Sequence, residues 1–375
     1  FESLATERGF AFDWTGFRHA MEVHGEASGK VVHTVMGDHG PIDAMKKAVK
    51  ETRFVGYETT EAEAEVKGMI RGSKLLDEID HLPPDEILSV VLDPTPFYGE
   101  SGGQAGDIGS ISADGLKVDI IETRKPLPEL IVHVGKVTEG TLEMGQNVQL
   151  TVDTAARQAT ALNHTATHIL HAVLVEVLGD HVKQAGSLVA PDRLRFDFSH
   201  YTAISHEELK RIETEVNRRI RENRSVETRE MSADEAIAEG ATALFGEKYG
   251  ERVRVVNMGD FSMELCGGTH TSAAGDIGLF KIIQEAGIAA GVRRIEAATG
   301  TRALDLIQQQ DDSLSRMAGL VKSDRPQLET RLLKMVERQK ELERELATLE
   351  SRLKAGQADD IMSKVVEIGD IKLLA

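Results

Sequence analysis

The sequence has very little cysteine and no long apolar run. Among its 375 residues Cys266 is the only cysteine, so no disulfide can form within the chain. No apolar stretch approaches the roughly 18 residues of a membrane-spanning helix, and nothing at the N-terminus resembles a signal peptide. These absences exclude a disulfide-stabilised scaffold and a helical membrane protein. A single thiol fits a reducing compartment, most simply the cytoplasm.

Positive charge is also scarce. The chain has 44 lysines and arginines against 62 acidic residues, a net charge of −18. This balance argues against binding nucleic acid through a general positive field, although a local basic stripe remains compatible with it. Residues 218–224, RRIRENR, carry four arginines and one glutamate. Composition alone favours the solvated face of a helix for this segment.

An initiator methionine is missing, and the final residues, VVEIGDIKLLA, are typical of a strand that has just begun. We therefore expect a piece of a larger protein. At roughly 100–200 residues per domain, the chain has room for two or three domains, each with its own core. Its hydrophobic content of 41% and charged content of 28% are typical of globular proteins.

Hydrophobic periodicity predicts an α+β chain built from successive parts. Residues 1–80 mix short helical patterns with glycine-bearing breaks and are predicted to form a helical linker. Within them, residues 52–70, TRFVGYETTEAEAEVKGMI, indicate a short strand followed by a helix. Paired prolines at 83 and 84 mark a boundary. Short β-rich runs over 81–153, separated by Gly, Pro and Asp, then predict a small antiparallel barrel or sandwich.

Residues 154–300 alternate helical and strand patterns and are predicted to form an α+β core. One long helical pattern opens this region and ends at Gly179. A serine followed three residues later by glutamate, the capping-box pattern, opens two further helices at Ser205 and Ser232.

Residues 301–355 consist of two helical runs broken at Pro326. They are predicted to form a helical hairpin, although an intermolecular coiled coil fits the same pattern. Residues 356–375 would then be the truncated start of a C-terminal domain. In the second run, eight heptad positions, seven of them apolar, alternate in steps of four and three: Leu328, Leu332, Met335, Gln339, Leu342, Leu346, Leu349 and Leu353.

Two histidine-containing motifs carry the chemistry. His164 and His168 are four residues apart on the long helix and so share a face. With 13 histidines in the chain such a pair easily arises by accident, and His171 on the same face is as readily a packed side chain. Much later, Cys266 precedes His270 by four residues, and two glycines between them allow a tight turn. Together the motifs supply three nitrogens and one sulfur, a donor set suited to zinc.

The spacing leaves the role of such a site open. Four protein ligands usually make a structural zinc site, whereas catalytic zinc keeps one position open. The competing interpretation is a buried, inert cysteine and a loop histidine. The H-E-x-x-H signature of metalloproteases is absent, because Thr165 takes the place of the glutamate. The glycine-rich residues 97–109, FYGESGGQAGDIG, lack the G-K-[ST] ending of a phosphate-binding loop and indicate tight β-turns.

Five segments together resemble the editing half of alanyl-tRNA synthetases and the related free-standing deacylases. They are FYGESGGQAGD, NHTATHILH, HVKQAGSLV, LRFDFSH and ELCGGTH, and they follow one another in the family's order between about residues 87 and 300. The resemblance implies that residues 1–80 are the link from the tRNA-recognition module. No stretch resembles the ATP- and alanine-activating core. The resemblance therefore implies a fragment that edits but does not aminoacylate.

The resemblance implies hydrolysis of the ester that joins serine or glycine to the alanine tRNA. Serine differs from alanine by one hydroxyl, which an apolar activation pocket rejects only weakly, so a second, hydrolytic site is required. The resemblance also implies one zinc ion, held by His164, His168, Cys266 and His270. Two mechanisms stay open: zinc activates the attacking water, or it binds the substrate amino group or orients the site, while the backbone and the terminal tRNA hydroxyl position the water.

Two further editing residues follow from the resemblance alone. The hydroxyl of Thr167 is expected to contact the serine side chain, although it could equally bond to its own helix carbonyl. Gln184 is expected to be a second editing residue, although it could be an exposed polar side chain before a glycine turn.

The expected partner is the alanine tRNA, held mainly by phosphate contacts. A homodimer through residues 301–355 is a further expectation for the full-length protein. The alternatives are a structural zinc module that only binds tRNA, a deacylase for another aminoacyl-tRNA such as threonyl-tRNA, and a purely assembling role for residues 301–355. The candidates for phosphate contacts are five arginines: Arg218, Arg219, Arg221, Arg293 and Arg294.

Overall fold

The computed structural model confirms a mixed α+β fold. It divides the chain into two compact units, residues 1–300 and 301–375. The residues that it describes are 45, 46, 49, 51–72, 74–76, 78, 79, 86–242, 252–363, 365–368 and 371–374, with side chains up to residue 356.

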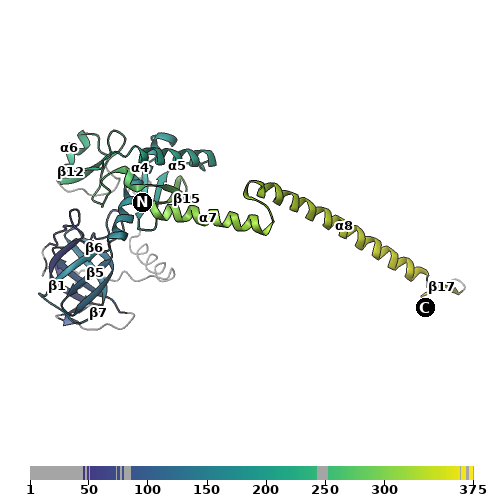
Figure 1. The fold of residues 1–375 in the computed structure, drawn as a ribbon, viewed down its shortest axis with the longest axis horizontal. Helices are drawn as coiled ribbons and strands as arrows, with labels where there is room; N and C mark the ends of the chain where they lie inside the picture. The colour runs from purple at the N-terminus through teal and green to yellow at the C-terminus, as the bar shows by residue number, and fades with distance from the viewer. Residues whose placement is uncertain are drawn as a thin grey trace, which may run out of the picture. The chain divides into compact units, whose positions relative to one another are not determined.

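A closed antiparallel barrel of six strands opens the larger unit (Figure 1). The order is β1-β4-β7-β6-β5-β9, and β9 pairs back onto β1. Because successive side chains of a strand point to opposite faces, alternate residues such as Val148 and Leu150 fill the interior. Short strands β2 (Lys74–Leu76), β3 (Glu78–Ile79) and β8 (Leu142–Glu143) border the barrel. The barrel strands are β1 (Glu61–Arg71), β4 (Leu88–Asp93), β5 (Gly109–Ala113), β6 (Leu116–Leu127), β7 (Leu130–Glu139) and β9 (Asn147–Val152).

One sequence prediction fails in the barrel. Residues Glu61–Arg71, predicted to be helical, form β1, so the barrel begins at residue 61 and not at 81. The segment EAEAEV contains good helix formers, but its period of two buries Ala64 and Val66 and exposes the glutamates. Pairing with both β4 and β9 overrides the local propensity. The predicted boundary at prolines 83 and 84 and the predicted linker helices before residue 45 lie outside the described residues.

A second core follows, built on the long helix α4 (Thr154–Leu178). Helix α5 (His206–Arg221) and one antiparallel sheet pack with α4 around buried side chains that include Leu170, Ile212 and Phe196. The predicted strands and both capping boxes are confirmed here. The sheet order is β10-β11-β16-β15, with strands β10 (Gln184–Val189), β11 (Leu194–Ser199), β16 (Val292–Thr299) and β15 (Phe280–Ala289).

A small three-stranded sheet completes this core and carries the loop with the single cysteine. Its order is β12-β13-β14, and helix α6 packs on its buried side, around Ala236 and Val255. The elements are β12 (Glu227–Ser232), α6 (Ala233–Ala238), β13 (Arg252–Asn257), β14 (Met263–Leu265) and the 3-10 helix η1 (Ala274–Ile277).

A buried arginine joins the barrel to α4. Asp153 caps α4 directly after β9, accepting a hydrogen bond from the Ala156 amide. One turn later Arg157 forms a buried ion pair with Asp107 of the barrel and donates to the Gly56 and Pro96 carbonyls, each at 2.8 Å. These contacts fix the direction in which α4 leaves the barrel.

The second unit is mainly helical. It contains most of α7 (Gly300–Leu320), the 3-10 helix η2 (Arg325–Gln327), α8 (Leu328–Ser363) and a hairpin of β17 (Val365–Ile368) and β18 (Ile371–Leu374). Most of the apolar heptad positions of α8 are exposed, including Leu342 and Leu346. Within the described part of α8, Leu328 is buried, and the apolar heptad positions from Leu332 to Leu353 are exposed. Among the described residues no helix is long and apolar enough to span a membrane.

Candidate metal centre

Helix α4 contributes two buried imidazoles to the centre. His164 and His168 lie on one face of the helix, with ring centroids 5.2 Å apart and ring planes only 14° from parallel. The spacing of four residues produces this parallel pair, because i and i+4 side chains lie one above the other on a helix.

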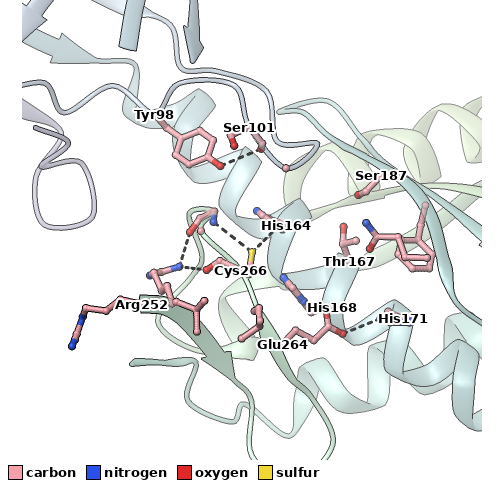
Figure 2. A pocket seen from close by; sticks show the side chains of 18 residues that line it. Tyr98, Ser101, His164, Thr167, His168, His171, Ser187, Arg252, Glu264 and Cys266 are labelled. Carbon is pink, nitrogen blue, oxygen red and sulfur yellow. Dashed lines mark hydrogen bonds and ion pairs between the residues drawn. The ribbon is translucent and has the colours of Figure 1, made fainter. Parts of the chain in front are cut away.

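The loop after β14 brings the other motif to the same place (Figure 2). The Cys266 sulfur lies 3.4 Å from His164 Nε2 and 3.3 Å from His270 Nε2. Close approach depends on Gly268, where a Cβ would overlap the ring of His164. The potential ligand atoms of His164, His168, Cys266 and His270 all lie within 4.8 Å of one another. The structure thus brings together the four residues that the motifs paired.

A glutamine from the barrel orients His164. Gln104 Oε1 lies 2.7 Å from His164 Nδ1 and also accepts the amide of Thr269, while its Nε2 donates to the Thr269 hydroxyl. Backbone hydrogen bonds between Val189 of β10 and the residues flanking Gln104 seat this loop on the sheet. With Nδ1 donating to Gln104, the Nε2 lone pair of His164 faces the centre.

A single carboxylate orients two histidines of α4. Glu264 accepts from His168 Nδ1 at 2.6 Å and from His171 Nδ1 at 2.9 Å. His168 Nε2 is then a buried ring nitrogen without a hydrogen-bond partner among the described residues. Such orphaned nitrogens are rare in proteins. Histidine metal ligands commonly bond a carboxylate through their other ring nitrogen, so this arrangement fits a ligand.

Protonation in the cluster also fits a cation. Burial raises the pKa of the Cys266 thiol, but the charge of His164 and its hydrogen bond outweigh burial and hold the pKa well below its ordinary value. Burial lowers the pKa of His270 to about 3, which leaves its imidazole neutral. Burial opposes charge on His168 as well, but Glu264 and Cys266 raise its pKa to about 10. Thiolate and neutral imidazole are the forms that bind metal, and a metal would displace the His168 proton.

A second set of contacts clamps the cysteine loop from outside. Arg254 of β13 donates to the carbonyls of Cys266 and Gly268, at 3.1 and 2.8 Å. Its guanidinium lies 4.3 Å from the ring centre of Tyr57, whose hydroxyl donates to the Gly267 carbonyl at 2.5 Å. The loop is therefore held in place by the residues that precede the barrel as well as by its own sheet.

His164, His168 and Cys266 line a pocket of about 410 Å³ (Figure 2), whereas His270 is not among its lining residues. Barrel residues Tyr98 and Ser101 line it on one side, and Thr167 and Gln184 on another. The hydroxyl of Thr167 donates to the Asn163 carbonyl at 2.8 Å, as the helix-bonding alternative predicted, yet Thr167 still borders the pocket. The structure thus brings both predicted editing residues to the same pocket as the cluster.

Comparison with known proteins agrees with this geometry. Residues 1–156 match the family described as tRNA synthetases class II (A), and residues 253–296 match the threonyl and alanyl tRNA synthetase second additional domain. The alanine–tRNA ligase of Xanthomonas campestris pv. campestris is 45% identical over 373 residues, covering 99% of this chain. That of Acetivibrio thermocellus is 43% identical over the same length. The chain belongs to the alanyl-tRNA synthetase family.

The chain spans only part of its relatives. It covers 42% of the length of each of these two ligases. The second-additional-domain match begins at β13 and includes both Cys266 and His270. The class II match begins at residue 1, so it includes the segment that the resemblance assigned to the link from the tRNA-recognition module.

The arginines predicted to contact tRNA are mostly paired within this synthetase chain. Arg218 bridges Glu215 and Glu222 along α5, and Arg219 bonds Glu215 and Glu176. Arg221 is exposed on the same helix. On β16, Arg294 makes a two-point contact with Asp197 at 2.7 and 2.8 Å, and Arg293 pairs with Glu285. Arg218 and Arg221 are exposed, as composition favoured for residues 218–224, whereas Arg219 and Arg293 are mostly buried in their ion pairs. Phosphate contact stays a prediction.

Sequence reasoning missed the residues that orient the ligands. Gln104 lies in the glycine-rich segment that was interpreted only as β-turns, and Glu264 stands two residues before the cysteine. A signal for Glu264 was available, since a carboxylate flanking a ligand motif often orients a histidine. Nothing in the spacing pointed to Gln104, because the barrel loop reaches His164 only through the tertiary fold.

Proposed function

We propose that this chain is an editing part of alanyl-tRNA synthetase, hydrolysing the ester of seryl- or glycyl-tRNA(Ala) at a zinc site. The observation that carries the proposal is the convergence of four ligand atoms within 4.8 Å, three of them from residues that line a pocket. The threonyl and alanyl second additional domain over residues 253–296 supports the same assignment. The expected organisation is a barrel from residue 61, an editing core over 154–300 and a helical region over 301–355.

The donor set fits zinc. His164, His168, Cys266 and His270 would hold one Zn²⁺ through three nitrogens and one thiolate, a common set for this ion. The buried, unpartnered Nε2 of His168 is the observation that favours an ion over a purely hydrogen-bonded cluster. Bound zinc would supply positive charge that stabilises the thiolate and polarises nearby groups. Because four protein ligands fill the usual tetrahedral shell, we favour a role in which the bound ion would hold the site in shape, while the backbone and the terminal tRNA hydroxyl position the water.

Selection for serine would fall to pocket side chains. The Thr167 hydroxyl donates to the Asn163 carbonyl, so its oxygen lone pairs remain free to accept a hydrogen bond. We propose that it accepts the hydroxyl of a bound seryl group. The side chain of Gln184, at the start of β10, is half-buried on the same pocket and offers both a donor and an acceptor. Alanine lacks the hydroxyl, so the correct ester would lose this contact and survive longer than the seryl ester. Glycine lacks the hydroxyl too, so hydrolysis of the glycyl ester would not depend on this contact.

The test is hydrolysis of charged tRNA(Ala) together with metal analysis. Wild-type protein should hold about one zinc per chain and shorten the half-life of seryl- and glycyl-tRNA(Ala) while sparing alanyl-tRNA(Ala). Cys266→Ala should lose both metal and hydrolysis. His206→Ala, which removes an exposed histidine at the start of α5, is the matched control and should keep both.

Each alternative predicts a different result. Stoichiometric zinc and tRNA binding with an unchanged ester half-life would leave a structural zinc module. Faster hydrolysis of another charged tRNA, such as threonyl-tRNA, would change the substrate. Full hydrolysis by metal-free protein would defeat the proposed site.

A further inference from the structure

Tyr201 stands out on the surface of the editing core. Its exposed fraction is 82%, the highest among the aromatic residues for which the structure describes exposure. It follows β11 directly after His200, and its ring lies over the backbone of Gly291, where a Cβ would be 3.5 Å away. A large ring on an exposed turn gains little stability from burial. Its position therefore suggests a contact with something outside the chain.

Two histidines lie near the Tyr201 ring, and the three rings of His181, His200 and Tyr201 are here called the ring platform. His181 Nε2 lies 2.8 Å from His200 Nδ1, and the two ring planes are 24° from parallel. Since a hydrogen bond between ring nitrogens lies near the planes of both rings, the imidazoles are side by side and nearly coplanar. The His181 ring is 6.1 Å from that of Tyr201, with planes 23° apart. The planes of His200 and Tyr201 are thus each tilted by less than 25° from the plane of His181, and His181 and Tyr201 are exposed.

A row of aromatic rings connects the ring platform to the pocket. Phe196 lines the pocket, its ring is 6.0 Å from that of Phe198, and Phe198 is 6.5 Å from His200. Tyr201 is five residues after Phe196, so their Cα atoms are at most about 18 Å apart. The ring platform therefore lies within a few nucleotides of any ester bound in the pocket.

We propose that the ring platform stacks an unpaired nucleotide of the tRNA 3′ end while the terminal aminoacyl nucleotide occupies the pocket. This inference rests on the proposed function for the position of the ester. Every tRNA presents unpaired nucleotides next to its charged terminus, and aromatic side chains bind such bases through their flat faces. Stacking also suits a chain with a net charge of −18, which cannot rely on a general positive field.

The ring platform is also more accessible for contact with tRNA than the arginines that are paired with glutamates. Arg218 and Arg219 of α5 are engaged with glutamates, and binding phosphate through them would require breaking those pairs. Tyr201 needs no such rearrangement, because its ring is already open to solvent.

The experiment measures binding and hydrolysis separately in Tyr201→Ala and Tyr201→Phe. Binding is measured with uncharged tRNA(Ala), intact or lacking its three unpaired 3′ nucleotides, and hydrolysis with seryl-tRNA(Ala). Loss of one stacked base costs about 1–3 kcal/mol, so Tyr201→Ala should weaken binding of intact tRNA about 5- to 150-fold. Tyr201→Phe keeps the ring face and should bind like wild type. Because Tyr201 is exposed, thermal unfolding should be unchanged in both variants.

The truncated tRNA provides the decisive comparison. Wild type should bind the truncated tRNA as weakly as Tyr201→Ala binds the intact tRNA. Tyr201→Ala should bind the truncated and the intact tRNA equally. In hydrolysis, Tyr201→Ala should raise KM with little change in kcat, since the ester chemistry is untouched. Equal binding of intact tRNA by wild type and Tyr201→Ala would overturn the ring platform even if wild type hydrolyses the ester. Absence of hydrolysis in wild type would instead refute the proposed function, while the binding comparison would still decide whether the ring platform holds the 3′ end.

Discussion

Helices α4 and α8 are both long, and each has one face that the sequence analysis singled out: the histidine face of α4 and the heptad face of α8. The two faces differ in how far other parts of the chain bury them. The marked face of α4 is buried: His164 and His168 are enclosed by a barrel loop and by the cysteine loop. The marked face of α8 is exposed, with Leu342 at 49% and Leu346 at 59%. Periodicity predicted a helix correctly in each case.

The difference lies in what the rest of the chain supplies. Around α4, barrel residue Gln104 and sheet residue Glu264 each satisfy a ring nitrogen of a helix histidine. In the described part of α8, the heptad leucines from Leu332 to Leu353 are not covered in this way and are 43–64% exposed. A polar helix face whose side chains find hydrogen-bond partners within the same chain indicates a functional site. A heptad face left open points to a second helix from outside.

The largest effect is expected when one added methyl group separates the cysteine loop from the buried histidine face of α4. Gly268→Ala would place a Cβ into the His164 imidazole and 2.7 Å from Gln104 Oε1. The loop must shift, which separates the sulfur from the helix histidines. We expect loss of bound zinc and a fall in seryl-tRNA(Ala) hydrolysis of about 100-fold or more, since small misplacements at a reacting centre cost about that much. Metal analysis and ester half-life measure both effects.

The adjacent glycine provides the control for that substitution. A Cβ at Gly267 would meet only the Tyr57 hydroxyl, at 3.9 Å, which is an ordinary contact. Gly267→Ala should keep metal and activity near wild type. If Gly268→Ala were equally tolerated, the close packing around His164 would not be needed for the site.

A weaker perturbation removes the carboxylate that orients His168. Glu264→Gln keeps the shape but replaces one acceptor oxygen with a donor that faces a ring N–H. We expect zinc affinity to fall about 10- to 100-fold, the usual loss for such an outer partner. Competition with a chelator measures this independently of activity. Glu230→Gln, on the exposed strand β12, should leave affinity unchanged; an equal loss there would mean that charge alone, and not orientation, is responsible.

The buried ion pair between Glu264 and His168 should make the stability of the metal-free protein depend on pH. Burial would raise the pKa of Glu264, but His168 outweighs it and lowers the pKa to about 2 from 4.5. Its contribution is therefore complete above pH 4.5 and is lost as pH falls through about 2. For His168, whose pKa is raised to about 10 from 6.5, stability is complete below pH 6.5 and lost as pH rises through about 10. Urea unfolding measures the free energy of unfolding of wild type and of Glu264→Gln. The difference between the two proteins should be largest between pH 4.5 and pH 6.5. A difference that does not depend on pH would contradict the ion pair between Glu264 and His168.

Particular elements show which parts of the secondary structure could be predicted from the sequence. Capping boxes at Ser205 and Ser232 and the glycine at the end of α4 are local signals, and the helices they predicted are present. The segment EAEAEV misled because each residue favours a helix while the pattern favours a strand. Only pairing of β1 with β4 and β9 decides between the two.

The site shows the same limit. Both motifs could be read from spacing, because each pair is held by one local element, a helix or a tight loop. Their meeting required the packing of β14 against α4, which no local signal encodes. Gln104 was beyond reach for the same reason, since it comes from a loop of the barrel and bonds His164 from 60 residues away.

The smallest expected effect on stability comes from the open face of α8. Leu342→Lys together with Leu346→Lys should change the free energy of unfolding by no more than about 0.5 kcal/mol, because both side chains are already exposed. If the heptad face pairs with a second copy of the chain, wild type should sediment as a dimer and the double variant as a monomer. Leu333→Lys is the control, since Leu333 is 59% exposed but off the heptad positions, and it should remain dimeric. A wild type that stays monomeric at every concentration would leave α8 without the partner that its pattern predicts.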